Sequence, residues 1–264
     1  DVIRRSFLQA SGKGFVGARN YQSVLLNEAF GRAAGNTARF MVICIPLLLL
    51  LSLCTALALR NTGVFKKAAK TGVLLPMAMP VASVAVCFQL IFDRQGFLNL
   101  FLTRLGEAAY SAGVLQSAPV FDIDYMGTGA AFWVLVFSDI WKNLGYTVVL
   151  WLTGILSIST QIREAARVDG AGEFTCFIRI IMPKLKPVLY TITVLSFLNT
   201  FKAFREAYLV AGSYPDESMY LLQHLFNNWF TNLDFDKMAA AAVILGFILF
   251  AAILLLQKLW DEGE

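Results

Sequence analysis

Three uncharged apolar runs constrain this chain more than any other feature of its sequence. They cover residues 40–59, 71–92 and 238–257. Each run is long enough to cross a hydrocarbon core of about 30 Å as a helix that rises about 1.5 Å per residue. Because 58% of the residues are hydrophobic and only 15% are charged, the composition is too apolar for an ordinary soluble domain. We therefore expect an all-α membrane protein.

Two further apolar runs carry charges and are also expected to span the membrane. Residues 129–156 include Asp139 and Lys142, and residues 187–211 include Lys202, Arg205 and Glu206. Five spans leave little room for a soluble domain, so residues 1–264 are interpreted as one polytopic transmembrane domain. Runs of this length differ from the short alternating strands of a β-barrel.

The basic residues between the spans predict the orientation of the chain. Positive charge concentrates in loops 60–70 and 157–186, which are therefore expected to be cytoplasmic. Loops 93–125 and 214–237 are comparatively acidic and are expected to be external, with a short helix over 97–105 lying along the outer surface. Parity also places residues 1–39 outside, although this segment carries six basic side chains: Arg4, Arg5, Lys13, Arg19, Arg32 and Arg39.

Loop 157–186 contains the most specific motif in the chain. It has the sequence E-A-A-R-V-D-G at 164–170 and, after nine more residues, I-I-M-P at 180–183. Good helix formers predict a helix over 161–169, and the glycines at 170 and 172 predict a break before a second helix. Small side chains would allow a partner surface to approach closely, and the charged ones can pair across that contact.

This motif resembles the cytoplasmic signature loop of binding-protein-dependent ABC importer permeases, E-A-A-x-x-x-G, nine residues, then I-x-L-P. Met182 stands where the family usually has Leu. Five other segments are similar to the carbohydrate-type members, which include maltose and glycerol-phosphate permeases: 15–21, 36–37, 139–146, 168–171 and 201–204. Arg205 departs from the acidic residue that usually follows the last of these segments.

The resemblance implies a function, a set of partners and a site. It implies a core of six spans, so that the first span would lie upstream of residue 1, and a multi-pass location in the bacterial plasma (inner) membrane. It implies assembly with ABC ATP-binding subunits, a second homologous permease and an extracytoplasmic solute-binding protein. ATP would be bound by the partner, so this chain needs no cofactor. The implied coupling residues are Glu164, Ala165, Ala166, Arg167, Asp169, Gly170, Ala171, Ile180 and Pro183.

Ionisable residues inside the spans are candidates for a substrate path, because a charge at membrane depth is costly unless it is paired or hydrated. Asn199 and Tyr208 lie near the second charged cluster and suit a sugar. The candidate path residues are Asp139, Lys142, Asn199, Lys202, Arg205, Glu206 and Tyr208. The alternatives are a structural ion pair between helices and charges that snorkel at span ends.

Several other function classes find no support in the sequence. There is no G-x-x-x-x-G-K-[ST] loop, so the chain itself is not expected to hydrolyse ATP, and no catalytic arrangement or metal-ligand set suggests an enzyme. His224, the single histidine, is not expected to bind a metal, and the net charge of +4 does not indicate nucleic-acid binding.

A secondary transporter driven by an ion gradient remains the alternative, motivated by Asp139, Lys142 and Glu206. The solute stays open among sugars, oligosaccharides, polyols and glycerol phosphate. The sequence also leaves open whether the second permease is a different chain.

Overall fold

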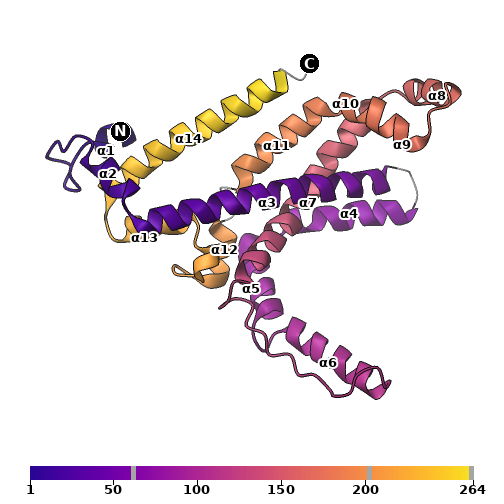
Figure 1. Ribbon diagram of the computed structural model, residues 1–264, viewed down its shortest axis with the longest axis horizontal. Helices are drawn as coiled ribbons and strands as arrows, with labels where there is room; N and C mark the ends of the chain where they lie inside the picture. Colours follow the sequence, from indigo (N-terminus) through magenta and orange to yellow (C-terminus); the bar gives the residue numbers. More distant parts are fainter. Residues whose placement is uncertain (61–63, 201–203, 262–264) are drawn as a thin grey trace. The chain divides into compact units, whose positions relative to one another are not determined.

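The computed structural model describes residues 1–60, 64–200 and 204–261 (Figure 1). Within these residues the chain is helical, and its β structure is limited to an isolated antiparallel bridge between Leu8 and Phe15. The chain forms two compact units. Unit 1 comprises residues 1–40, 85–135 and 203–264, and unit 2 comprises residues 41–84 and 136–202.

Three helices, at 28–59, 81–92 and 131–157, contribute residues to both units. Helices of unit 1 are α1 (Val2–Ser6), α2 (Arg19–Leu25), α3 (Glu28–Leu59), α5 (Val81–Phe92), α6 (Phe97–Ser111), α12 (Phe204–Ala211), the 3-10 turn η2 (Glu217–Met219), α13 (Leu222–Thr231) and α14 (Phe235–Asp261). Helices of unit 2 are α4 (Val64–Ala78), α7 (Ala131–Ser157), α8 (Thr160–Val168), α9 (Glu173–Cys176), the π-turn η1 (Phe177–Ile181), α10 (Met182–Lys184) and α11 (Lys186–Thr200).

Among the described residues, three helical stretches are long and apolar enough to cross a membrane: α3, residues 81–111 and α14. The number rises to five if each of two bent pairs counts as one span. These pairs are α7 with α8, bent by 71°, and residues 173–184 with α11, bent by 64°. The expected all-α polytopic architecture is therefore present.

The run at 71–92 is not one helix. It contains the end of α4 and all of α5, which are separated at Met79 and Pro80. Proline lacks the N–H that would continue the helix, and its ring crowds the preceding turn. Pro76 and Pro46, by contrast, lie within α4 and α3. The predicted short helix over 97–105 is present as the longer α6.

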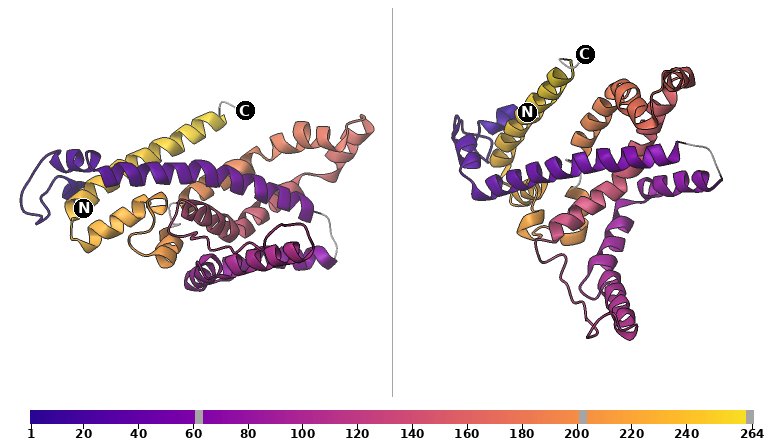
Figure 2. Two further views of the ribbon diagram at one scale, coloured as in Figure 1. Left: turned by 60° about the horizontal axis from the view of Figure 1, so that its bottom comes forward. Right: turned by 45° about the vertical axis from the view of Figure 1, so that its right-hand side comes forward.

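Unit 1 has a core built from α2, the start of α3, α13 and α14. Figure 2 shows α1 and α2 beside the yellow α14, against which both pack. Phe30 stacks on Trp229 with ring centroids 6.5 Å apart. The fully buried members of this core include Val24, Ala33, Ala240 and Ala241.

Polar side chains in unit 1 bind backbone groups at and near helix ends. The Asn20 amide donates to the carbonyl oxygens of Ser6 and Leu8 at 3.0 and 2.8 Å. Asn36 donates to the carbonyl oxygens of Glu217 and Tyr220, and Thr37 Oγ1 accepts from the Leu222 N–H at 3.0 Å. Two of the segments that resemble the permease family thus satisfy backbone groups that helices leave unpaired.

His224 predicts how the stability of unit 1 depends on pH. Burial lowers the pKa of this imidazole from 6.5 to about 4, and Nδ1 accepts from the Leu221 N–H at 3.1 Å. As the pH falls below 6.5, His224 binds a proton in the unfolded chain but stays neutral in the folded chain. We therefore expect stability to fall between pH 6.5 and 4, by up to about 3 kcal/mol. Thermal unfolding of the purified protein over this range checks the slope, and His224→Asn should flatten it.

Unit 2 is organised around a buried stripe of α3 that faces α7. The stripe consists of Cys44, Leu48, Ser52, Ala56 and Leu59. Trp151 of α7 is buried against it and donates from Nε1 to Ser52 Oγ at 3.0 Å. Buried small residues at this spacing allow close helix packing inside a membrane, where packing and hydrogen bonds replace the hydrophobic drive.

Candidate functional site

The signature motif forms a helical hairpin at the junction of α7 and α11 (Figure 1). Helix α8 contains positions 160–168, and α9, η1 and α10 follow after a short turn. Gly170 adopts a left-handed φ of +81°. The Ala171 N–H donates to the Ala166 carbonyl at 2.9 Å, across five residues. This is the Schellman arrangement, in which glycine is favoured because other residues pay for the left-handed conformation. The predicted helix, turn and second helix are all present.

One side of the hairpin is fixed to the core of unit 2. Ala166, Cys176 and Ile181 are buried in the same apolar cluster as Trp151, and Ala171 packs against that cluster. Ile180, one of the predicted coupling residues, also packs there. The small side chains therefore serve first to seat the hairpin against its own unit, which makes it a rigid extension of the helices that carry it.

The opposite side of the hairpin exposes large apolar side chains. Val168 is 87% exposed and Phe174 is 78% exposed, on either side of the turn. The hairpin also has exposed charged residues: Glu164, Asp169, Glu173, Arg179 and Lys184. A rigid element that exposes both large apolar and charged side chains has the composition of a protein-binding surface.

The remaining predicted coupling residues occupy defined positions in the hairpin. Ala165 is exposed on α8, to which Arg167 also belongs. Pro183 is exposed and lies in the first turn of α10, where proline is tolerated because the N–H is not needed. The π-helix η1 lies between α9 and α10, and its last residue, Ile181, is buried in the core of unit 2.

Asp139 lies between α3 and α7 and is only 6% exposed. Its carboxylate oxygens accept from Cys44 Sγ at 3.2 Å and from Asn143 Nδ2 at 2.9 Å. Asn143 also donates to the Asp139 carbonyl oxygen. Asp139 is thus held in a hydrogen-bonded cluster between two helices of unit 2, which corresponds to a structural role rather than an open cavity.

The other predicted path residues are distributed over both units. Lys142 lies half-buried on α7, and Asn199 of α11 donates to Tyr146 Oη at 3.0 Å, so α7 and α11 are bridged. Tyr208 of unit 1 accepts from Ser213 Oγ at 3.3 Å. Arg205 and Glu206 belong to α12. Lys202 lies outside the described residues.

Sequence reasoning missed two parts of these sites. Cys44 is not among the predicted site residues, yet its Sγ donates to Asp139. A carboxyl group within an apolar span needs hydrogen-bond donors, so the position of Asp139 predicts a donor on a neighbouring helix. The exposure of Val168 and Phe174 was also missed, because helical periodicity does not say which apolar side chain leaves the core.

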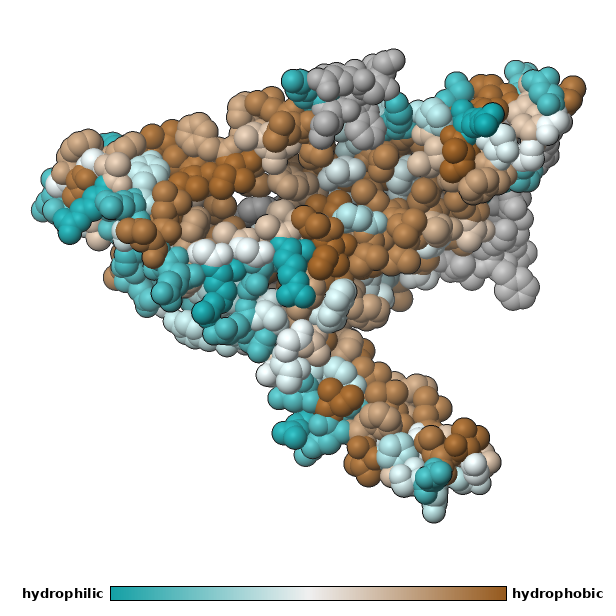
Figure 3. All heavy atoms as spheres, in the orientation of Figure 1, coloured by the Kyte–Doolittle hydropathy of each residue, from teal (hydrophilic) through white to brown (hydrophobic). Residues whose placement is uncertain are grey.

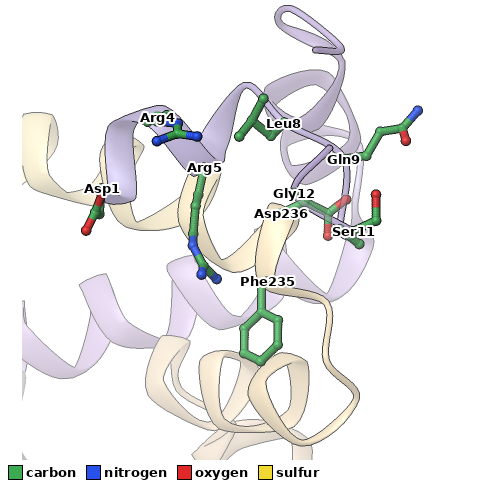
Figure 4. A pocket seen from close by; sticks show the side chains of 10 residues that line it. Asp1, Arg4, Arg5, Leu8, Gln9, Ser11, Gly12, Phe235 and Asp236 are labelled. Atoms are coloured by element: carbon green, nitrogen blue, oxygen red, sulfur yellow. The ribbon is translucent and has the colours of Figure 1, made fainter. Parts of the chain in front are cut away.

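The hollows of unit 1 include two that are lined by charged side chains. One, of about 260 Å³, lies between the N-terminal segment and the start of α14, and Figure 4 shows Arg4 and Arg5 on one side and Ser11 and Asp236 on the other. The other, of about 270 Å³, is lined by Ala29, Arg32, Tyr214, Pro215, Glu217 and Tyr220. Among the described residues, no group of three or more His, Cys, Asp or Glu side chains is placed to hold a metal ion.

Comparison with known proteins identifies a family over most of the chain. The family described as "Binding-protein-dependent transport system inner membrane component" matches residues 48–261. The match includes the hairpin, Asp139 and α14.

Individual relatives and solved structures agree with this match. The chain is 30% identical to the trehalose/maltose transport system permease protein MalF of Thermococcus litoralis over 239 residues, covering 90% of this chain and 76% of that protein. It is 28% identical to the sn-glycerol-3-phosphate transport system permease protein UgpA of Salmonella typhimurium, covering 89% and 76%. A crystal structure of a bacterial ABC transporter involved in alginate import has the same fold, with a TM-score of 0.79 at 19% identity, covering 99% of this chain and 88% of that one.

Proposed function

The chain belongs to the family of binding-protein-dependent transport system inner membrane components, and from this premise we propose that it forms the translocation path of an ATP-driven carbohydrate importer. It is an integral protein of the inner membrane and a transport permease. The hairpin at 160–184 is the part of this chain that we assign as the contact site for the ATP-binding subunit.

The geometry of the hairpin is the observation that carries this proposal. Its inner side is fixed by Ala166, Cys176 and Ile181, and its outer side presents Val168 and Phe174. The outer apolar side chains can bind another subunit, and the packed inner side makes the hairpin move together with its own unit. A displacement of the bound subunit is therefore transmitted to unit 2 as a rigid-body motion. Closure of the ATP-binding subunits would shift the hairpin, and α7 and α11 would move with it.

Carbohydrate transport is supported by the relatives, which include trehalose/maltose, xylose/arabinose and diacetylchitobiose permeases. Lys142, Asn199, Lys202, Arg205, Glu206 and Tyr208 remain our candidates for the substrate path, whereas the hydrogen-bonded Asp139 is assigned a structural role. Of these, Asn199 and Tyr208 present the amide and phenol groups that sugar hydroxyls bind, although both already have partners within the protein.

The partners of this chain are part of the proposal. A solved relative of the same fold is described in complex with a pentasaccharide-bound periplasmic protein, at 18% identity and a TM-score of 0.76. By analogy, an external solute-binding protein would deliver the substrate to this chain. A second homologous permease would complete the path, and two ATP-binding subunits would drive it.

Substitutions at Asp139 distinguish the ATP-driven importer from the ion-gradient-driven transporter. In a proton- or sodium-driven transporter, a carboxyl group that carries the coupling ion cannot be replaced by an amide. In the structure, the two Asp139 oxygens accept separately from Cys44 and Asn143. In Asp139→Asn the amide oxygen can still accept from Asn143, and the amide NH2 faces Cys44 Sγ, to which it can donate. We expect Asp139→Asn to keep most of the uptake and to cost about 1 kcal/mol or less of stability. Asp139→Ala, which removes the acceptor and leaves a cavity, should cost about 2–4 kcal/mol.

The direct test of the proposed function is uptake by vesicles that contain the complete complex. Labelled maltose, trehalose, xylose and glycerol 3-phosphate are supplied with their binding protein, with ATP inside the vesicles. Uptake that requires ATP and survives a protonophore and a sodium ionophore supports the importer. Uptake that ignores ATP and collapses with either gradient would replace it with the secondary transporter.

A further inference from the structure

The side of α6 that faces the rest of unit 1 is polar. Asn99 is buried and donates to the carbonyl oxygens of Arg94 and Ile123 at 2.9 and 2.8 Å. Thr103 Oγ1 accepts from the Phe121 N–H at 3.0 Å. The buried Gly106 lies so close to Pro119 that a Cβ atom at this position would fall 2.4 Å from the proline ring. The returning loop at 119–123 is therefore held along α6 by polar groups and a glycine.

The outward side of α6 is apolar. Phe97, Leu100, Phe101 and Leu105 are between 48% and 65% exposed. Phe97 and Phe101 are one helical turn apart, and their rings stack with centroids 6.1 Å apart. Figure 3 shows the brown, apolar side chains that run along this helix. Positions 97, 101 and 105 share one helix face, because residues four apart are neighbours on a helix.

This distribution is the reverse of that of a helix on a water-soluble protein, which turns its apolar stripe to the core and its polar side to the solvent. Side chains as large as these contribute favourable free energy only when they leave water. We propose that α6 lies in the membrane interface, with the face formed by Phe97, Phe101 and Leu105 buried among lipid acyl chains.

Two further observations favour lipid over a protein partner. Helix α5, which precedes α6 in the apolar stretch 81–111, also exposes large apolar side chains at Val86 and Leu90. Toward the C-terminal end of α6, Arg104 and Glu107 form an exposed ion pair at 3.1 Å. Arg104 is seven residues from Phe97 and therefore lies on the apolar side, where its long side chain can reach from an interfacial helix to the headgroups. The helix would tie the loop 93–130, predicted to be external, to the surface of the bilayer.

The test measures which medium surrounds the two sides of α6. Cys54 and Cys87, the two exposed cysteines, are first replaced with Ala, and Cys44 and Cys176 stay because both are buried. A spin label is then attached to Phe101→Cys or, as the matched control in the ion pair near the end of the helix, to Glu107→Cys. The assembled transporter is placed in phosphatidylethanolamine and phosphatidylglycerol vesicles. Collision rates are recorded with oxygen, which partitions into lipid, and with a neutral nickel chelate, which stays in water.

We expect the ratio of oxygen to nickel accessibility at position 101 to exceed that at position 107 several-fold. High nickel accessibility at both positions would show that the apolar face is in water and would overturn the proposal. Low accessibility to both reagents at position 101 would show that a protein subunit covers this face and would equally overturn it. Should Phe101→Cys fail to assemble, Phe97→Cys reports on the same face.

Discussion

Replacing Gly170 with Val is expected to lower uptake by about 5- to 150-fold while ATP hydrolysis by the complex continues. Gly170 has a φ of +81°, and an added Cβ atom would meet nothing within 4 Å. The substitution therefore causes no clash inside the chain and acts only through the turn and the surface beside it. Left-handed backbone costs an L-residue about 1–2 kcal/mol, and β-branching makes it worse. A lost coupling free energy of about 1–3 kcal/mol corresponds to a fall in uptake of about 5- to 150-fold.

Two variants serve as controls for this prediction. Gly170→Asn keeps a residue that tolerates the left-handed conformation, so most of the uptake should survive. Gly172→Val adds the same side chain two residues away, at an exposed position with an ordinary φ of −65°, and should be milder. Uptake and ATPase rates are measured on the same vesicles. Normal uptake by Gly170→Val would contradict the role that we give to the turn.

Replacing Gly145 with Ala is expected to produce the largest loss of stability among single glycine substitutions in unit 2. A Cβ atom at position 145 of α7 would lie 2.6 Å from the Val73 carbonyl oxygen and 3.2 Å from Leu74 Cα, both in the backbone of α4. Backbone cannot rotate away as a side chain can, so the two helices must separate. Overpacking of this kind costs about 1–3 kcal/mol. The loss of stability is measured as a fall in the midpoint temperature of thermal unfolding in detergent, and the yield of assembled complex is measured alongside it.

Gly72→Ala is the matched control, because Gly72 lies on α4 and an added Cβ atom would have open space around it. Alanine forms helices better than glycine by up to about 1 kcal/mol, so this variant should be neutral or slightly more stable. Equal stability of the two variants would mean that α4 and α7 do not approach as closely as the structure indicates.

Much of this fold follows from local features of the sequence. The absence of charge over twenty residues predicts helices where α3 and α14 lie, because only a backbone that satisfies its own hydrogen bonds is stable in lipid. The hairpin was predictable as well, because Gly170 follows a run of good helix formers and is itself followed by Gly172. In both cases the deciding physics acts between residues that are near one another in the chain.

The features that escaped prediction depend on contacts between distant residues. Cys44 and Asp139 are 95 residues apart and meet only because α3 packs against α7. The break before α5 depends on whether the surroundings of a proline tolerate it within a helix. Pro46 lies inside the continuous α3, whereas Pro80 lies in the break between α4 and α5. The outward position of Phe174 and of the apolar face of α6 depends on which side of each helix the rest of its unit covers.

The most direct test of the account places a photo-crosslinking amino acid at Phe174 in the native membrane and identifies the adduct by mass spectrometry. The same group at Leu26, an exposed residue of the predicted external segment, is the control. We predict that position 174 crosslinks to an ATP-binding subunit and that position 26 does not. If the complex is intact and active and position 174 gives no adduct with an ATP-binding subunit, then the hairpin is not the site where this permease receives its drive.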